Sequence, residues 1–302
     1  MASNVLNRRR VESVADELGT NPGLIEKDWH VVRAIGVIAG MDHDSTSPVF
    51  AGGTSLFKGW GLIKRFSEDV DFKVSMPSDA TRVSRRTYRN RILAALADAQ
   101  FTLLGEPLRG NASRFFSADL AYPMEFGAGP GLRPHIKIEM TFAPPALPPI
   151  VRPVSSLVAL VGGEGPEIAG FPCVDPIETA ADKLSALAWR VCADQHGEDR
   201  EDPSVIRHLH DLAALESLVA EQPEFIRLLQ QSMLADAHRG GEGVPANPAA
   251  RVALMLDCLS NYKQWSVNYR SLVHQVSFGD PDDIVSFDDA LEACRRLTAV
   301  LA

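Results

Sequence analysis

Cysteine is scarce in this sequence, and its few cysteines stand far apart. The chain of 302 residues has four, at positions 173, 192, 258 and 294. No two of them have the Cys-x-x-Cys spacing of a zinc site, and their number and separation do not suggest a disulfide framework. We therefore expect four buried thiols.

Long apolar runs are also missing. No run approaches the roughly 20 residues that a helix needs to cross a bilayer. The first residues, with three consecutive arginines at 8–10, lack the apolar segment of a signal peptide. With 45% hydrophobic residues to form a core, the chain is predicted to be a folded, soluble, cytoplasmic protein without a membrane partner.

Basic residues are fewer than acidic ones: the sequence has 30 Lys and Arg and 39 Asp and Glu, which gives a net charge of −9. This balance argues against a protein whose whole surface binds nucleic acid. The distribution is uneven, however, and a predicted helix at 79–99 is rich in arginine. Arg82, Arg86 and Arg89 share one helical phase and form a predicted RNA-binding surface; the alternative is an ordinary solvated helix face.

The two halves of the sequence differ in their predicted secondary structure. Strand-like segments at 47–51, 69–74, 114–120 and 135–142 alternate with helical segments, whereas the pattern after residue 175 is almost wholly helical. Five prolines between 144 and 153 mark a border. We predict an α+β protein, with a core of mixed sheet, flanking helices and N-terminal helices at 1–153, and a mainly helical domain at 154–302 that completes the active site.

A glycine turn separates the first strand from a helix. Gly52 and Gly53 offer backbone amides to an anion, and the hydroxyls of Thr54 and Ser55 can add hydrogen bonds to the terminal phosphates of a nucleotide. A turn of this kind is more often a plain start of a helix, and the neighbouring acidic strand is what favours the functional interpretation.

That strand carries Asp69 and Asp71, which point to the same side because side chains alternate along a strand. Glu139, on a later strand, is the natural third carboxylate. Clustered acids are usually balanced by a divalent cation with oxygen ligands, typically Mg²⁺. Three carboxylates around two Mg²⁺ ions suit nucleotidyl transfer from an NTP, with Glu139 on the nucleophile side as ligand or base.

The helical half offers further cations. Lys183 and Arg190 stand seven residues apart on one predicted helix face and are candidates for closing over the nucleotide. Arg207 and Asp211 stand at i and i+4, which also fits a simple ion pair within a helix.

These segments together resemble, in order, the motifs of the AbiEii/AbiGii toxin family, which includes the MenT-type toxins of type IV toxin–antitoxin and abortive-infection systems. The matching segments are Gly-Gly-Thr-Ser-Leu at 52–56, Arg-Phe-Ser-Glu-Asp-Val-Asp-Phe at 65–72, Lys-Ile-Glu at 137–139, Asp-Lys-Leu-Ser-Ala at 182–186 and Arg-His-Leu-His-Asp-Leu at 207–212. Glu-Lys-Asp-Trp at 26–29 resembles the family's N-terminal motif.

The resemblance implies a polymerase-β-like nucleotidyltransferase core, an NTP substrate and a separate antitoxin encoded nearby. Relatives add nucleotides to the tRNA 3′ acceptor end, which stops translation. Ser55 matches a phosphate-contacting hydroxyl, Asp69 and Asp71 match the metal-binding pair, and Lys183 and Asp211 match residues needed for activity. Glu139 stands at an acidic position that varies.

Two other functions stay open from the sequence. The same core can transfer AMP to a protein instead of RNA. A nucleotide-binding interaction module without turnover is the third hypothesis, although a cluster of acids kept without a metal would destabilise such a module.

Overall fold

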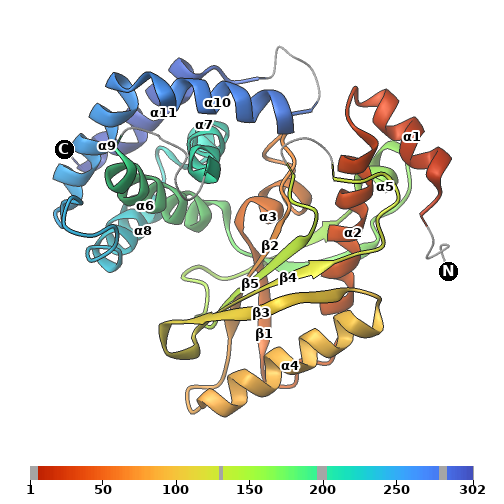
Figure 1. The fold of residues 1–302 in the computed structure, drawn as a ribbon. Helices are drawn as coiled ribbons and strands as arrows, with labels where there is room; N and C mark the ends of the chain where they lie inside the picture. The colour runs from red at the N-terminus through yellow and green to blue at the C-terminus, as the bar shows by residue number, and fades with distance from the viewer. Residues whose placement is uncertain (1–5, 129–131, 196–202, 279–283, 302) are drawn as a thin grey trace. The chain divides into compact units, whose positions relative to one another are not determined.

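The structure is a computed structural model that describes residues 6–128, 132–195, 203–278 and 284–301 (Figure 1). The chain forms two compact units, unit 1 at Met1–Val174 and unit 2 at Asp175–Ala302. Unit 1 contains the sheet and unit 2 is helical. This architecture confirms the predicted α+β class, a mixed sheet flanked by helices and followed by a helical region.

Unit 1 is built on a seven-stranded sheet in the order β3-β4-β5-β2-β1-β7-β6. Two neighbouring pairs, β2 with β5 and β1 with β7, are parallel and the others are antiparallel. The strands are β1 Ser47–Ala51, β2 Asp69–Ser75, β3 Thr102–Gly110, β4 Phe115–Ala121, β5 Ile136–Thr141, β6 Ile150–Val154 and β7 Ile168–Cys173.

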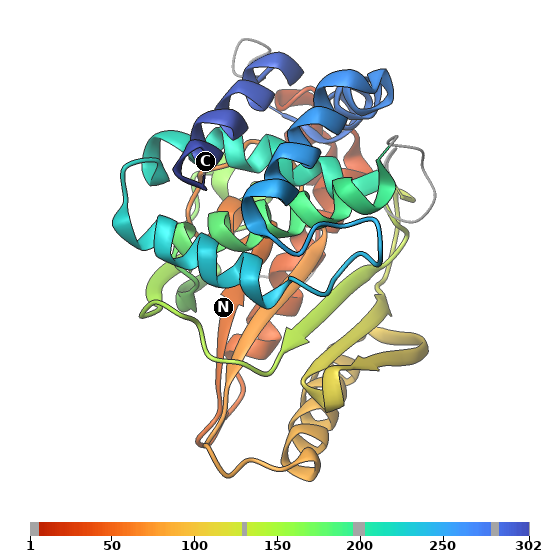
Figure 2. The same ribbon diagram turned by 90° about the vertical axis from the view of Figure 1, so that its left-hand side faces the viewer.

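Helices cover one face of this sheet. Figure 1 and Figure 2 show α4 running along the sheet beside β3, and side chains of α2 and α4 share one hydrophobic core with the sheet. Asn21 caps α2 through its side chain, and Pro22 is the first helical residue, where a missing N–H costs nothing. The helices of unit 1 are α1 Arg8–Glu17, α2 Pro22–Ala39, α3 Gly52–Lys58, α4 Arg82–Asp98 and α5 Leu157–Val161.

The border between the units falls after Val174, later than the border after residue 153 that the prolines suggest. The reason lies in β6 and β7, which pair with each other, while β7 joins β1 through Phe50 and Cys173. Pro153 lies in β6, the edge strand of the sheet. Proline is tolerated at an edge because its missing N–H faces no neighbouring strand.

Unit 2 packs its helices around α6, which contacts α7, α8 and α9. The helices are α6 Pro176–Asp194, α7 Arg207–Val219, α8 Pro223–Ala235, α9 Pro248–Asn261, α10 Lys263–Val276 and α11 Phe287–Thr298. All four cysteines of the chain are free thiols and buried, as predicted. Among the described residues, no helix has the length and apolar character that spanning a bilayer requires.

Candidate active site

Asp71 lies directly against the glycine turn. Gly52 follows β1 with φ of +72°, a conformation that glycine adopts without steric penalty. A Cβ placed on Gly52 would lie 2.0 Å from Oδ2 of Asp71, and Ala51 pairs with Asp71 in the antiparallel β1–β2 register. The first glycine is therefore required both by the backbone conformation and by the carboxylate beside it.

Three carboxylates share the face of the sheet opposite the hydrophobic core. Along β2, buried residues alternate with partly exposed ones, and Asp69 and Asp71 are among the latter. The parallel β2–β5 register sets Asp71 beside Glu139 and Asp69 beside Lys137. Because paired residues of adjacent strands point to the same side, the structure puts Asp69, Asp71 and Glu139 on one surface.

The surroundings of Glu139 disfavour its charged form. Burial raises the pKa of Glu139, the Lys137 ammonium opposes that rise, and the negative charge of Asp69 adds to it. Nζ of Lys137 lies 3.9 Å from Oε1 of Glu139. Burial is thus the main reason why the charged form of Glu139 is disfavoured, and Lys137 offsets only part of it.

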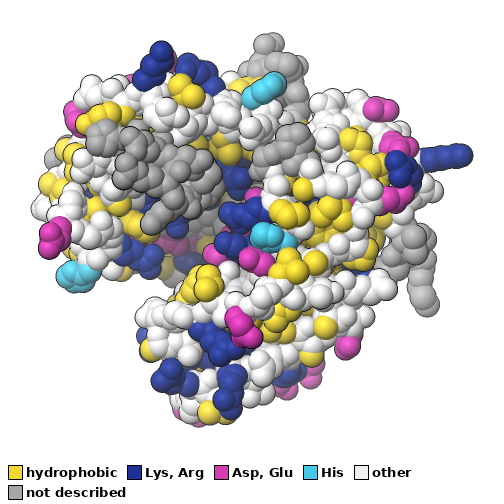
Figure 3. All heavy atoms as spheres, viewed as in Figure 1, with side chains coloured by type: hydrophobic (Ala, Val, Ile, Leu, Met, Phe, Trp, Pro, Cys, Tyr) yellow, Lys and Arg dark blue, Asp and Glu magenta, His cyan; other side chains and the backbone are white. Residues whose placement is uncertain are grey.

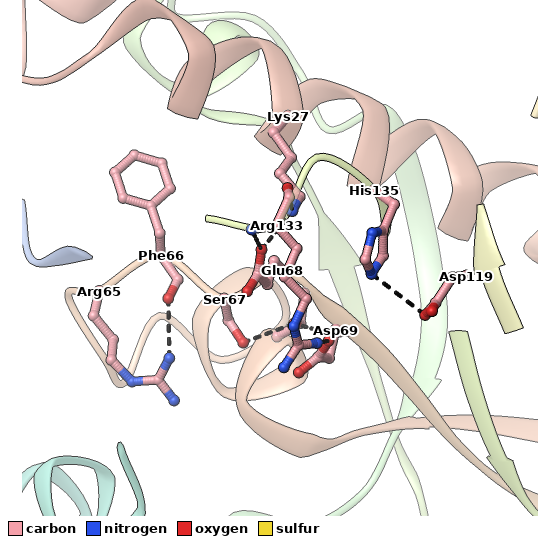
Figure 4. Close-up of polar contacts among 10 residues, drawn as sticks. Lys27, Arg65, Phe66, Ser67, Glu68, Asp69, Asp119, Arg133 and His135 are labelled. Carbon is pink, nitrogen blue, oxygen red and sulfur yellow. Dashed lines mark hydrogen bonds and ion pairs between the residues drawn. The ribbon is translucent and has the colours of Figure 1, made fainter. Parts of the chain in front are cut away.

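The side chain of Asp69 is directed to Arg133. Nη1 of Arg133 lies 2.8 Å from Oδ1 of Asp69 (Figure 4). In the part of the chain that the structure describes, no group of three His, Cys, Asp or Glu side chains is close enough to hold a metal ion. The predicted triad Asp69, Asp71 and Glu139 therefore shares a surface, but its side-chain oxygens do not converge on one point.

The two hydroxyls of the turn lie in the protein interior. Thr54 is fully buried; its Oγ1 donates to the backbone carbonyl of Asp69 and lies 2.9 Å from Oγ of Ser67. Ser55 is equally buried. Burial raises the pKa of the Cys173 thiol to about 11, and the Ser55 hydroxyl beside it offsets part of that rise. Thr54 thus fixes the start of β2, a role that the sequence did not reveal.

A buried ion pair holds the loop before the acidic strand. Lys27 of α2 pairs with Glu68, and both side chains are almost completely buried. Lys27 Nζ also donates to the carbonyl of Arg133 at 2.7 Å, while the Arg133 amide donates to Oε2 of Glu68 at 3.0 Å (Figure 4). Burial lowers the pKa of Lys27, and Glu68 counteracts this effect. These contacts position Arg133 beside Asp69.

The neighbours of Lys27 on α2 have similar roles. Glu26 accepts hydrogen bonds from the backbone amides of Glu125 and Phe126 at 2.7 and 3.0 Å. Asp28 pairs with Lys58, the last residue of α3, and accepts a hydrogen bond from the Leu157 amide at 2.7 Å. The Glu-Lys-Asp motif therefore connects α2 to several segments of unit 1, at Lys58, Glu68, 125–126, Arg133 and Leu157. Sequence reasoning quoted this motif but gave it no role.

In unit 2, Lys183 and Asp211 form a buried pair. Nζ of Lys183 lies 2.8 Å from Oδ2 of Asp211, and Asp211 has no exposed side-chain surface. His210 Nδ1 lies 3.5 Å from the other carboxylate oxygen. Arg190, later on α6, stacks its guanidinium over Trp189 at 5.2 Å from the ring centroid. The sequence identified Lys183 and Asp211 separately and missed that they contact each other.

The predicted RNA-binding arginines line one groove of unit 1. The groove is lined by Arg82, Arg86 and Arg89 of α4. Arg109 of β3 also lines it and was not predicted from the sequence. Arg109 stands alone in its segment, so the sequence gives no signal for it.

A glycine turn against an acidic strand of a mixed sheet is the arrangement of a nucleotidyltransferase core. The sequence profile described as "Nucleotidyl transferase AbiEii toxin, Type IV TA system" matches residues 41–293. The chain belongs to this family, the AbiEii nucleotidyltransferase toxins of type IV toxin–antitoxin systems. The predicted family membership and the prediction of a nucleotidyltransferase enzyme are confirmed.

A solved structure supports the same fold. The chain is similar to MenT4, a nucleotidyltransferase toxin from Mycobacterium tuberculosis H37Rv, with a TM-score of 0.62 and 20% sequence identity. The similarity covers 98% of this chain and 90% of that one. A comparison with curated proteins finds no match. The family implies an NTP substrate and a cognate antitoxin.

Proposed function

We propose that this toxin transfers a nucleoside monophosphate from an NTP to RNA in a Mg²⁺-dependent reaction, with the 3′ acceptor end of tRNA as the acceptor. The product would be a tRNA that no longer supports translation, and the cognate antitoxin would counteract this effect. The observation that carries the proposal is the contact between Asp71 and Gly52, next to Glu139 on the adjacent strand.

The carboxylates fit a magnesium site by their chemistry. Asp69, Asp71 and Glu139 supply the hard oxygen ligands that Mg²⁺ prefers. Burial, and to a smaller extent the charge of Asp69, raise the pKa of Glu139, so a bound cation would stabilise its charged form. When bound, Mg²⁺ neutralises phosphate charge and lowers the pKa of an attacking hydroxyl. Asp69, whose carboxylate pairs with Arg133, would be one of the residues that hold this ion.

The nucleotide phosphates would be held by the glycine turn after β1. Because the side chains of Thr54 and Ser55 are buried, we assign phosphate binding to the backbone amides of Gly52 and Gly53 instead of these hydroxyls. By the family resemblance, Lys183 and Asp211 also contribute to activity. Lys183 and Arg190, which stand seven residues apart on α6, are the further candidates for nucleotide binding.

Incorporation of labelled nucleotide tests the proposal. Purified protein is incubated with each of four labelled NTPs, Mg²⁺ and total tRNA, and the wild type should label RNA. Asp71→Asn keeps the side-chain volume and removes the charge, so it should abolish labelling while the protein stays folded. Chelation of the metal should have the same effect on the wild type.

The alternatives give different results in this assay. Label in added cellular polypeptide, with RNA unlabelled, would identify a protein-modifying enzyme. The interaction module would be supported if Asp71→Asn raised the melting temperature and left toxicity in cells unchanged. Absence of transfer to RNA from every NTP would overturn the proposal.

A further inference from the structure

A groove of about 530 Å³ opens between the start of α4 and the turn that follows β3. Four arginines line it, Arg82, Arg86, Arg89 and Arg109, together with Val83 and the segment 110–113. No carboxylate belongs to this lining among the described residues. Figure 3 shows Lys and Arg side chains gathered there, at the lower left of the view.

Arg89 is the unusual member of this set. It is 4% exposed, and its Nη1 is buried without a hydrogen-bond partner. Its guanidinium stacks over Phe116 at 5.4 Å from the ring centroid. Burial lowers the pKa of Arg89, and the charges of Arg109, Arg85 and Arg86 lower it further. A buried cation among like charges is destabilising unless an anion balances it.

Arg251 shows how the protein satisfies a buried arginine that has a purely structural role. Its side chain is completely buried, and it donates to the backbone carbonyls of Pro245, Met233 and Ala246 at 2.8 to 3.2 Å. In Arg89, by contrast, Nη1 is buried without an acceptor among the described residues. This donor is therefore available to a ligand bound in the groove.

We propose that the groove binds one backbone phosphate of the RNA acceptor, with the guanidinium groups of Arg89 and Arg109 donating to its oxygens and Arg82 and Arg86 adding charge at the rim. This inference rests on the proposed function, since it specifies where that RNA is held. Arginine forks match the geometry of phosphate oxygens. Protein interfaces, by contrast, are centred on aromatic and other large apolar side chains. Besides its arginines, this lining offers only Val83 and the residues 110–113, none of them aromatic.

The groove lies on the α4 side of the sheet, where Arg89 stacks over the core residue Phe116, whereas the carboxylates lie on the opposite face. β3 is separated from β2 by β4 and β5, and strands lie about 4.8 Å apart, so the lateral spacing across the sheet is about 14 Å. An RNA held in the groove would pass around the β3 edge of the sheet to bring its end to Asp71. The phosphate held at Arg89 would therefore fix how far the RNA end extends toward the active site.

Equilibrium binding of labelled tRNA to the full chain tests the site. Arg89→Gln and Arg109→Gln should each weaken binding about tenfold, because each removes a charge-assisted hydrogen bond. The slope of log affinity against log salt should fall by about 0.7 to 0.9 for each lost phosphate contact. Arg85→Gln is the matched control: it removes the same charge from α4, but Arg85 does not line the groove and donates to the Ala80 carbonyl instead.

A stability measurement separates a ligand site from a structural arginine. Arg89→Met keeps a long side chain on Phe116 and removes the unbalanced charge, so its melting temperature should equal or exceed that of the wild type while RNA binding weakens. Arg109 is exposed, so Arg109→Gln informs on binding even if a substitution at Arg89 disturbs folding.

The possible outcomes are distinct. If Arg89→Gln and Arg109→Gln bind tRNA like Arg85→Gln, the groove is not a phosphate site, whether or not the wild type transfers nucleotides. If these variants lose tRNA binding but the wild type labels no RNA, the site stands and the proposed reaction fails. Unchanged tRNA binding combined with loss of binding to an acidic protein partner would assign the groove to that partner and overturn the inference.

Discussion

Replacing Gly52 by alanine should inactivate the enzyme by displacing Asp71. The new Cβ would lie 2.0 Å from Oδ2 of Asp71, whereas ordinary contacts begin at 3.4 Å, so the carboxylate has to retreat by about 1.4 Å. A misplacement of about 1 Å in a catalytic group can lower the rate about 100-fold. We expect Gly52→Ala to lose nucleotide transfer to at least that extent.

Gly61→Ala is the matched control for the backbone. Gly61 has φ of +65°, close to the +72° of Gly52, but no atom lies within 4 Å of its added Cβ. Both variants should lose about 1–2 kcal/mol of unfolding free energy to the left-handed conformation, and Gly52→Ala should lose a further 1–3 kcal/mol or so to overpacking.

Two assays compare Gly52→Ala with Gly61→Ala. Urea denaturation gives the unfolding free energies, and pyrophosphate release under saturating NTP and RNA gives the activities. Gly61→Ala should keep its activity despite its lower stability. Equal activity in Gly52→Ala and Gly61→Ala would refute the reasoning, because the contact between Asp71 and the turn would then have no catalytic consequence.

Three further predictions concern the buried charges. Lys27→Met removes the cationic partner of the buried Glu68 carboxylate, so the unfolding free energy in urea should drop by about 3–5 kcal/mol. Combining Lys27→Met with Glu68→Leu should recover most of it, and failure to recover would contradict the pairing. Burial raises the pKa of Glu139, so the folded state still binds a proton that the unfolded state releases near pH 4.5. The unfolding free energy of the wild type relative to Glu139→Gln should therefore fall as pH rises from 4.5 through the raised pKa. Urea titrations of both proteins from pH 4 to pH 8 measure this difference in unfolding free energy, and a difference that rises with pH would contradict the prediction. Lys183→Met removes the ammonium partner of the buried Asp211 carboxylate and should lower the unfolding free energy by about 3–5 kcal/mol in the same assay. Adding Asp211→Leu should restore folding without restoring nucleotide transfer, and recovery of transfer would show that the pair is only structural.

The acidic surface could be predicted because it depends on local rules. Asp69 and Asp71 point to one side because side chains alternate along any strand, and β2 shows that alternation. The turn at Gly52 is also local. The pairing of Asp71 with Glu139 depends on which strands become neighbours, and alternation within each strand does not contain that information.

The direction of Asp69 could not be predicted for the same reason. It is determined by Arg133, which Lys27 and Glu68 position from distant parts of the chain. Charged residues in a helix are usually solvated, so the Glu-Lys-Asp sequence at 26–28 gave no hint that all three residues are buried. Their burial follows only from partners that other segments provide.

The strands that the sequence did not predict lie toward the edges of the sheet. β3 exposes Leu103, Leu104 and Leu108 and changes register between Leu104 and Leu108, so its sequence has no alternating pattern. β6 and β7 each contain a proline, which is typical of segments outside a sheet. Edge strands are defined by their neighbours more than by their own residues.

The four buried thiols make the protein suitable for chemical labelling. Burial raises the pKa of every one of them, and a protonated, inaccessible thiol does not react with maleimides or disulfide reagents. One cysteine introduced on the surface, for instance beside the arginine groove, could therefore carry a fluorophore without removal of the native ones. The native thiols would react only when the surrounding structure opens, and their modification rate would report how often that happens.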